Sequence, residues 1–196
     1  SGTEGYHQVW LIAKRTINGA TKRYVEYFTP QFDSVDDIED AHFVDGGLTY
    51  AGAPTSVLAG LDHLEGETVT ILGDGAVRPE LVVSGGSITL DRSVSKATVG
   101  LGYTSTLITL PGVVGAQDGS TQGKSKSWDR FKARLYRTIG PKINGERVAT
   151  RSAADIMTTA LQPFTGLKTV TLDGWDEEAQ ITVEQDLPLP ATILAL

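Results

Sequence analysis

Four basic side chains flank a predicted turn near the N-terminus and are the first candidates for binding chemistry. They are Lys14, Arg15, Lys22 and Arg23. Between them, Asn18-Gly19 favours a type I′ hairpin turn, because both residues tolerate positive φ. In the resulting hairpin over Val9 to Phe28, the two inner basic residues face each other across the strands, and so do the two outer ones. Like charges in that position destabilise a sheet, so we expect the tip to meet solvent or an anionic partner.

An edge hairpin explains the same residues equally well, because lysine and arginine on an exposed edge protect a sheet from aggregation. The base of the hairpin is apolar on both faces, with residues such as Trp10 and Val25 gathered there. The sequence therefore leaves two interpretations of the basic tip open.

Aromatic residues provide a second set of candidates. Tyr50, Tyr103, Trp128 and Trp175 are the rings that we consider as a ligand platform. Small β-domains often carry binding sites on their loops, and a flat ring suits a carbohydrate or another host-surface ligand. Core packing is the competing interpretation for each tryptophan.

Catalytic patterns are missing from the sequence. With three histidines and no cysteine, the chain has no thiol nucleophile or thiolate metal site, and it has no nucleophile elbow. Gly123-Lys124-Ser125 resembles the end of a phosphate-binding loop, but the position that requires glycine is Asp118. The acidic stretch after Asp33 lacks the glycine and glutamate of a calcium loop. We predict no enzyme, cofactor or metal.

Pairs of carboxylates are the remaining catalytic alternative. Folding can bring two acids to glycosidase spacing from anywhere in a chain. The candidates are Glu65 with Glu67, and Asp173 with Asp176 and Glu177. Ordinary surface acids around turns are the favoured interpretation.

Composition limits the partners. The 196 residues are 40% hydrophobic and 21% charged, with a net charge of −7, which is typical of a globular protein. That charge disfavours nucleic-acid binding by the whole surface, so any DNA contact has to be local. No apolar run approaches the ~20 residues of a membrane helix, and we predict no membrane insertion.

Short β-rich runs dominate the middle of the chain. We predict strands over Glu67–Leu72, Leu81–Ser84, Ser87–Leu90 and Ala97–Leu101, with turns at Gly73-Asp74-Gly75, Arg78-Pro79 and Gly85-Gly86. Connections this short permit only antiparallel pairing. The pattern predicts a small β-barrel or sandwich.

The C-terminal part returns to strands. We predict them over Trp128–Thr138, Leu167–Leu172, Ala179–Glu184 and Ala191–Leu196, with a turn at Asn144-Gly145. The first has an apolar side and a basic side. Only Ser152–Leu161 has a helical composition. The apolar last strand needs a cover, and we expect it to pair with the N-terminal hairpin or with the Phe131 strand.

Several of these segments resemble a domain of bacteriophage tail proteins that is similar to the FCCH barrel of ubiquitin-activating enzymes. The resemblance lies in Gly60 to Glu67, Asp74-Gly75, Gly85-Gly86, Ile88-Thr89-Leu90 and Val99 to Tyr103, and it extends to Val9–Phe28, Arg134–Thr138 and Leu187–Pro190. In those enzymes the barrel is a non-catalytic insertion, so no ubiquitin chemistry follows.

The resemblance implies a mainly β fold in which a small antiparallel β-barrel is inserted in a second antiparallel β domain. The expected parts are the hairpin within 1–34, the barrel at 42–111, a flexible loop at 112–127, and the remainder of the second domain at 128–196. The implied function is a structural component of a phage tail, at the nozzle or the distal tail tube. The resemblance also implies that the protein is made in the bacterial cytoplasm and is located in the virion.

The implied partners are other tail subunits, in a homo-oligomeric ring formed by a longer chain, with a transient DNA contact at the four basic residues. A carbohydrate- or host-surface-binding β module is the alternative function.

Overall fold

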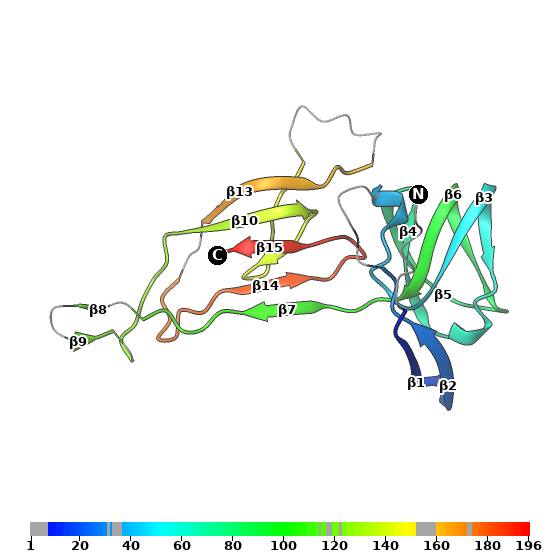
Figure 1. Ribbon diagram of the computed structural model, residues 1–196, viewed down its shortest axis with the longest axis horizontal. Coiled ribbons are helices and arrows are strands. Elements are labelled where there is room, and N and C mark those ends of the chain that lie inside the picture. The colour runs from blue at the N-terminus through cyan, green and yellow to red at the C-terminus, as the bar shows by residue number, and fades with distance from the viewer. Residues whose placement is uncertain are drawn as a thin grey trace. The chain divides into compact units, whose positions relative to one another are not determined.

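The computed structural model describes residues 8–30, 32, 37–113, 115–116, 119–121, 123–151, 160–171 and 174–196. The chain divides into two consecutive units, Ser1–Gly102 and Tyr103–Leu196. Strands make up nearly all the regular structure of both units, and every strand pair in the described residues is antiparallel (Figure 1). The predicted fold class, mainly antiparallel β, is confirmed at this level.

The first unit combines a hairpin with a four-stranded sheet. Its elements are β1 (Trp10–Ile17), β2 (Ala20–Tyr27), η1 (Ile38–Asp40), β3 (Asp45–Ala59), η2 (Asp62–Leu64), β4 (Thr68–Gly73), β5 (Ala76–Val82) and β6 (Ser87–Leu101). The sheet order is β3-β6-β4-β5, and β1 pairs with β2. Among the described residues β5 does not pair with β3, so the sheet is open and the expected closed barrel is not found.

Two strands of this sheet are longer than predicted. The strand β6 joins the segments 87–90 and 97–101 into one, and β3 covers residues 45–59, where we predicted no strand. Both prolines of the region, Pro54 and Pro79, lie inside edge strands at shifts of register. An edge strand with a bulge tolerates proline, which is why Arg78-Pro79 does not form the predicted turn.

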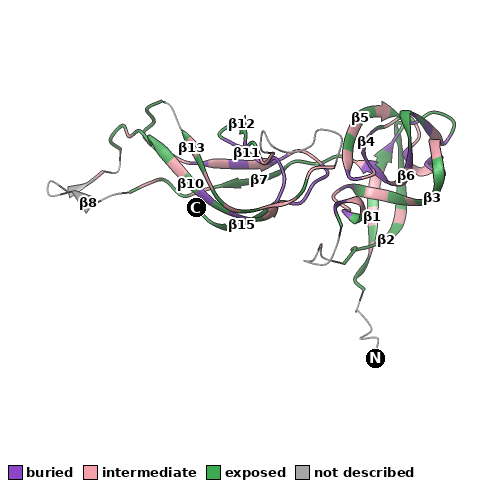
Figure 2. Ribbon diagram, turned by 90° about the horizontal axis from the view of Figure 1, so that it is seen from above, coloured by how far each residue is buried: buried purple, intermediate pink, exposed green. Residues whose placement is uncertain are grey.

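The core of the first unit is built from the inward residues of β3, β4 and β6. Val69 and Ile71 are fully buried, and Leu64 of η2 is buried in the same cluster. The hairpin contributes Ile17 to the same cluster. Figure 2 shows this buried layer. The turns at Asp74-Gly75 and Gly85-Gly86 have the positive φ that the sequence predicts.

The second unit contains two larger sheets and a short hairpin. Its strands are β7 (Ser105–Ile108), β8 (Gly115–Ala116), β9 (Gly119–Ser120), β10 (Arg130–Thr138), β11 (Lys142–Ile143), β12 (Glu146–Arg147), β13 (Phe164–Thr171), β14 (Thr182–Gln185) and β15 (Thr192–Ala195). The sheet orders are β13-β10-β15 and β12-β11-β14-β7, and β8 pairs with β9. Ala133, Leu135 and Ile143 are fully buried at its core.

Most C-terminal predictions agree with this unit. The strand β10 alternates as expected, with Ala133 and Leu135 buried and Arg130, Lys132 and Arg134 exposed. The last strand, β15, pairs with β10, one of its two predicted partners. Asn144 and Gly145 have positive φ between β11 and β12. The predicted helix at 152–161 falls mainly on residues 152–159, outside the described residues.

The inserted arrangement of domains is not confirmed. The hairpin, which we expected to belong with residues 128–196, contacts the rest of the first unit through Ile17 in the core and through Arg15 bonded to Asp45. The expected flexible loop at 112–127 is partly paired, because Gly112 bonds to Glu178 and Lys126 forms a backbone bridge with Asp176.

Candidate functional site

The hairpin register is the predicted one, and it separates the four basic residues onto two faces. Lys14 lies opposite Arg23 and Arg15 opposite Lys22, with Asn18 and Gly19 both at positive φ in the turn. Since adjacent residues of a strand point to opposite faces, these two pairs point away from each other. The tip is therefore not one patch of four charges.

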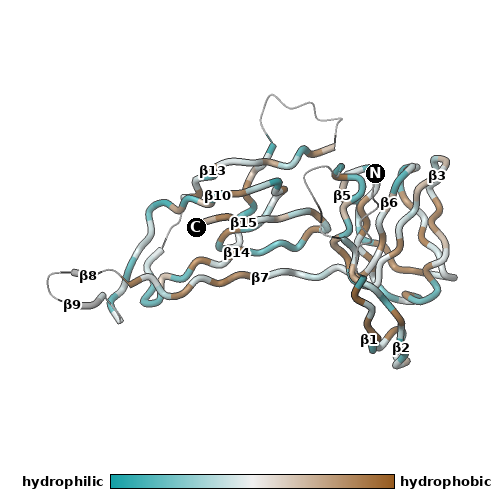
Figure 3. The backbone as a smooth tube through the Cα atoms, in the orientation of Figure 1, coloured by the Kyte–Doolittle hydropathy of each residue, from teal (hydrophilic) through white to brown (hydrophobic). Residues whose placement is uncertain are grey.

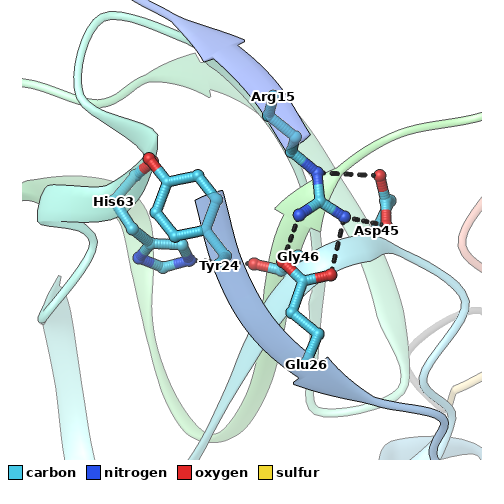
Figure 4. A network of polar contacts seen from close by, with 6 residues as sticks. All are labelled: Arg15, Tyr24, Glu26, Asp45, Gly46 and His63. Carbon is cyan, nitrogen blue, oxygen red and sulfur yellow. Dashed lines mark hydrogen bonds and ion pairs between the residues drawn. The ribbon is translucent and has the colours of Figure 1, made fainter. Parts of the chain in front are cut away.

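The inner face of the hairpin is held by a charged cluster around Arg15 (Figure 4). The guanidinium donates to both carboxylate oxygens of Glu26, at 2.8 Å for the Nη2 to Oε2 bond. It also donates to Asp45 on β3, through Nε at 3.2 Å and Nη2 at 2.5 Å. Planar guanidinium groups suit such two-pronged bonds to carboxylates. The cluster ties β1 and β2 to the edge strand of the sheet.

These bonds leave Arg15 little capacity for an outside partner. Its side chain is only 14% exposed, and the hydrogen bond to Glu26, followed by that to Asp45, raises the pKa of Arg15 above its ordinary value despite opposing desolvation. For Arg15, the anionic partner that the sequence predicts is thus supplied by Glu26 and Asp45 of the same chain. Neither Glu26 nor Asp45 was predicted, because nothing in the sequence indicates that Asp45 lies beside the hairpin.

A second contact fixes the same face. The Tyr24 hydroxyl donates to the His63 backbone oxygen at 3.3 Å, and His63 Nε2 lies 2.9 Å from the Gly46 oxygen. At the turn, the backbone N–H of Asn18 donates to the Glu67 carboxylate at 3.0 Å. With Ile17 in the core, the hairpin is anchored along its inner side from base to tip.

The outer face of the hairpin has the opposite character. Trp10 pairs with Tyr27 and Ile12 with Val25 across the strands. These side chains are 59%, 48%, 71% and 70% exposed, respectively. The rings of Trp10 and Tyr27 are 5.1 Å apart. Figure 3 shows hydrophobic residues on β1, a strand that Figure 2 colours largely as exposed or intermediate. We call these four residues the outer apolar face.

The other basic residues differ in their surroundings. Lys14 and Arg23 are exposed and continue the outer apolar face towards the tip. Lys22 lines a polar hollow of about 380 Å³ together with Asp62 and Glu65. The structure therefore brings Lys14 and Arg23 together as exposed cations, whereas Lys22 lies beside carboxylates.

The first acid pair considered for catalysis has structural roles. Glu65 accepts the amides of Gly86 and Gly85 at 2.8 and 3.0 Å, and these bonds hold the pKa of Glu65 below its ordinary value. Glu67 accepts the amide of Asn18. Of the second set, Asp176 accepts the amide of Ala179 at 3.1 Å, and Asp173 lies outside the described residues.

Two of the four aromatic candidates share one pocket. Trp128 and Trp175 line a cavity of about 160 Å³ in the second unit. Tyr50 lies in the first unit, where it packs against the core and its hydroxyl donates to the Ala53 oxygen at 2.6 Å. Tyr103 is about half exposed and does not line this pocket. We call the cavity the tryptophan pocket.

Polar side chains complete the tryptophan pocket. It is also lined by Lys126, Asn144, Gly174, Asp176, Ala179 and Gln180. Trp128 and Trp175 were predicted as members of one ligand platform and Asp176 as a member of an acid set, whereas Asn144 and Gln180 were not predicted. Their types gave no signal because asparagine and glutamine are common on any surface.

The described residues contain neither a metal-binding cluster nor a membrane-spanning helix. They contain no group of three or more histidine, aspartate or glutamate side chains placed to hold a metal ion. The same part of the chain contains no helix with the length and apolar character needed to span a bilayer.

Comparison with known proteins does not identify the chain. No protein-family model matches it, and a search of curated proteins found no match. The resemblance to phage tail proteins therefore stays a prediction.

Proposed function

We propose that this chain is a structural component of a bacteriophage tail, at the nozzle or the distal tail tube, where it contacts neighbouring subunits of a homo-oligomeric ring in the virion. The resemblance described above supports the tail, and the outer apolar face supports the role in assembly. This role requires no catalytic residue, cofactor or metal.

The outer apolar face is the observation that carries the proposal. Four large apolar side chains lie in two directly opposed pairs and are 48–71% exposed. Fully burying a side chain of this kind stabilises by about 1.5–3 kcal/mol. Contiguous apolar patches on a surface mark interaction sites more often than isolated apolar residues do. Because the inner face is already anchored, the hairpin presents this patch in a fixed orientation within its unit.

A second copy of the chain is the occupant that we propose for this face. Lys14 and Arg23 border the apolar residues, and the chain as a whole has 24 acidic against 17 basic residues. Another copy therefore offers acidic surface to those two cations, and opposite charges around an apolar centre favour one orientation of docking. In a ring around DNA, the same two cations are the residues that we expect at the exit path.

Substitution of the apolar centre tests this proposal. We expect the double variant Ile12→Ser with Val25→Ser to weaken self-association at least about 100-fold, since two buried aliphatic side chains are lost. Light scattering over a range of concentrations measures the association, and circular dichroism checks the fold. The matched control is Thr16→Ser with Thr21→Ser, on the same face nearer the turn.

Two outcomes would contradict the proposal. The unchanged chain could remain monomeric at every concentration, which would favour an autonomous binding module. Alternatively, the double variant could associate as strongly as the control, which would place the subunit contact elsewhere.

A further inference from the structure

The tryptophan pocket combines an exposed ring with a ring that is held in place. Trp175 is 76% exposed and Trp128 is 38% exposed. The Trp128 indole nitrogen donates to the Ala179 oxygen at 2.7 Å. Gly112 packs so closely against this ring that a Cβ there would lie 2.5 Å from Trp128 Cζ2. The ring of Trp128 is therefore held in place, and Trp175 exposes its ring to solvent beside it.

The backbone that carries the pocket is tied together across a long sequence separation. Lys126 and Asp176 exchange two backbone hydrogen bonds of 2.8 Å each. The Lys126 ammonium also donates to the Glu177 oxygen at 2.6 Å. These bonds position Trp175, the neighbour of Asp176, relative to Trp128. A preformed site of this kind loses little conformational freedom when a ligand binds.

Three polar side chains of the pocket are each held through one atom. Asn144 Oδ1 accepts the Thr182 amide at 2.8 Å, Asp176 Oδ2 accepts the Ala179 amide, and Gln180 Nε2 donates to the Thr109 oxygen at 3.0 Å. Each side chain also has a second polar atom: an amide nitrogen, a carboxylate oxygen and an amide oxygen, respectively. The pocket thus combines an aromatic face with hydrogen-bond donors and acceptors on side chains that are already held in place.

We propose that the tryptophan pocket binds one residue of a neutral saccharide. One face of a pyranose ring exposes C–H groups that stack on an indole, while its hydroxyl groups both donate and accept hydrogen bonds. A volume of about 160 Å³ corresponds to roughly five waters, which suits a single sugar ring rather than an extended chain. A few placed polar groups beside an apolar surface give a small-ligand site its orientation and specificity.

Charge distinguishes this ligand from the other flat ligands that stack on tryptophan. Asp176 lines the pocket together with a basic residue, Lys126, and the next two residues of the chain, Glu177 and Glu178, are exposed. Three carboxylates repel the phosphate of a nucleotide or nucleic acid. They also repel the acid groups of sialylated or sulfated sugars. A neutral hexose has no such penalty.

The test is a titration of the full chain with a panel of neutral mono- and oligosaccharides. Binding is monitored through the indole N–H signals in NMR spectra. We expect at least one neutral sugar to shift the Trp175 signal, and Trp175→Ala to weaken its binding at least about tenfold. Trp175→Phe should retain part of the affinity because it keeps a stacking ring. Trp10→Ala is the control, since Trp10 is exposed in the other unit.

The proposal is overturned if no neutral sugar shifts the Trp175 signal at the highest soluble concentration. It is equally overturned if Trp175→Ala binds the sugar as well as the unchanged chain does, or if nucleotides bind at the pocket in preference to sugars. Because Trp175 is exposed, its substitution leaves the fold intact, and circular dichroism verifies this. Failure here leaves the assembly role untouched, since that role is measured by particle mass.

Discussion

The outer apolar face and the tryptophan pocket both expose a tryptophan, but their surroundings differ. Trp10 lies beside Tyr27, Ile12 and Val25, so its neighbours are apolar. Trp175 lies with Trp128 among carboxylate, amide and ammonium groups. An apolar neighbourhood suits a partner that buries area, whereas a polar neighbourhood suits a hydroxyl-rich ligand. The residues around an exposed ring, rather than the ring itself, therefore indicate its partner.

The strongest test of this comparison removes the anchor that holds the outer apolar face. We expect Arg15→Met to lower the free energy of unfolding by about 2–3 kcal/mol, because bonds to two carboxylates are lost and Glu26 is left without its cation. Urea denaturation measures the change. Lys14→Met, one residue away on the exposed face, is the control and should change stability by less than about 0.5 kcal/mol. Equal effects of the two variants would show that the charged cluster does not anchor the hairpin.

Substitution of each tryptophan in turn tests the two surfaces separately. We expect Trp10→Ala to weaken self-association about 30-fold, the effect of losing one well-buried interface residue of this type, and to leave sugar binding unchanged. Trp175→Ala should do the reverse. Light scattering and sugar titration of both variants complete the comparison. If either variant impairs both properties, the two surfaces do not act independently.

Acid should affect the unit of the hairpin first. Burial lowers the pKa of His42 below its ordinary value of 6.5, so the unfolded chain binds the proton more readily. The stability that neutral His42 contributes is complete above pH 6.5 and is lost as pH falls from there through the folded pKa. His42→Gln should make the unfolding of the first unit less dependent on pH. Hydrogen exchange measures this unfolding. An unchanged pH profile would contradict this assignment.

The second unit should respond at lower pH, which gives that experiment an internal reference. Burial of Asp186 raises its pKa, but hydrogen bonds from Lys142 and Arg147 outweigh this and hold it below 3.8. Stability from Asp186 is therefore complete above pH 3.8 and is lost only as pH falls below that value. Protection in the second unit should survive the range in which His42 takes up its proton.

The smallest expected effect on stability concerns the exposed cations. Lys14→Ser with Arg23→Ser should change the free energy of unfolding by less than about 0.5 kcal/mol, since these two like charges face each other and gain nothing from the pairing. We expect the same variant to reduce the salt dependence of association and to slow DNA delivery in assembled tails. Arg15 remains unchanged in this design, because its loss would disturb the anchor as well. Particles with normal salt dependence and normal DNA delivery would exclude both roles.

Local sequence signals predicted most of the turns and many of the strands, although Arg78-Pro79 lies in a strand rather than in the predicted turn. Asn18-Gly19, Asp74-Gly75 and Asn144-Gly145 form turns with positive φ, because the backbone preference of these pairs is a property of the residues themselves. Alternation in β10 identified its buried side for a similar reason. The long strand β3 was missed, since its glycines and Pro54 are typical of loops until an edge position and a bulge accommodate them.

By itself, the sequence determined the β class, the hairpin and its register, because each depends on neighbours along the chain or directly across one turn. Only the tertiary structure decided which faces are occupied. It brings Asp45 to Arg15 across 30 residues, leaves the outer apolar face uncovered within its unit, and joins Trp128 to Trp175 in one pocket. Such contacts depend on how sheets pack in space, and residues far apart in sequence carry no local signal of meeting there.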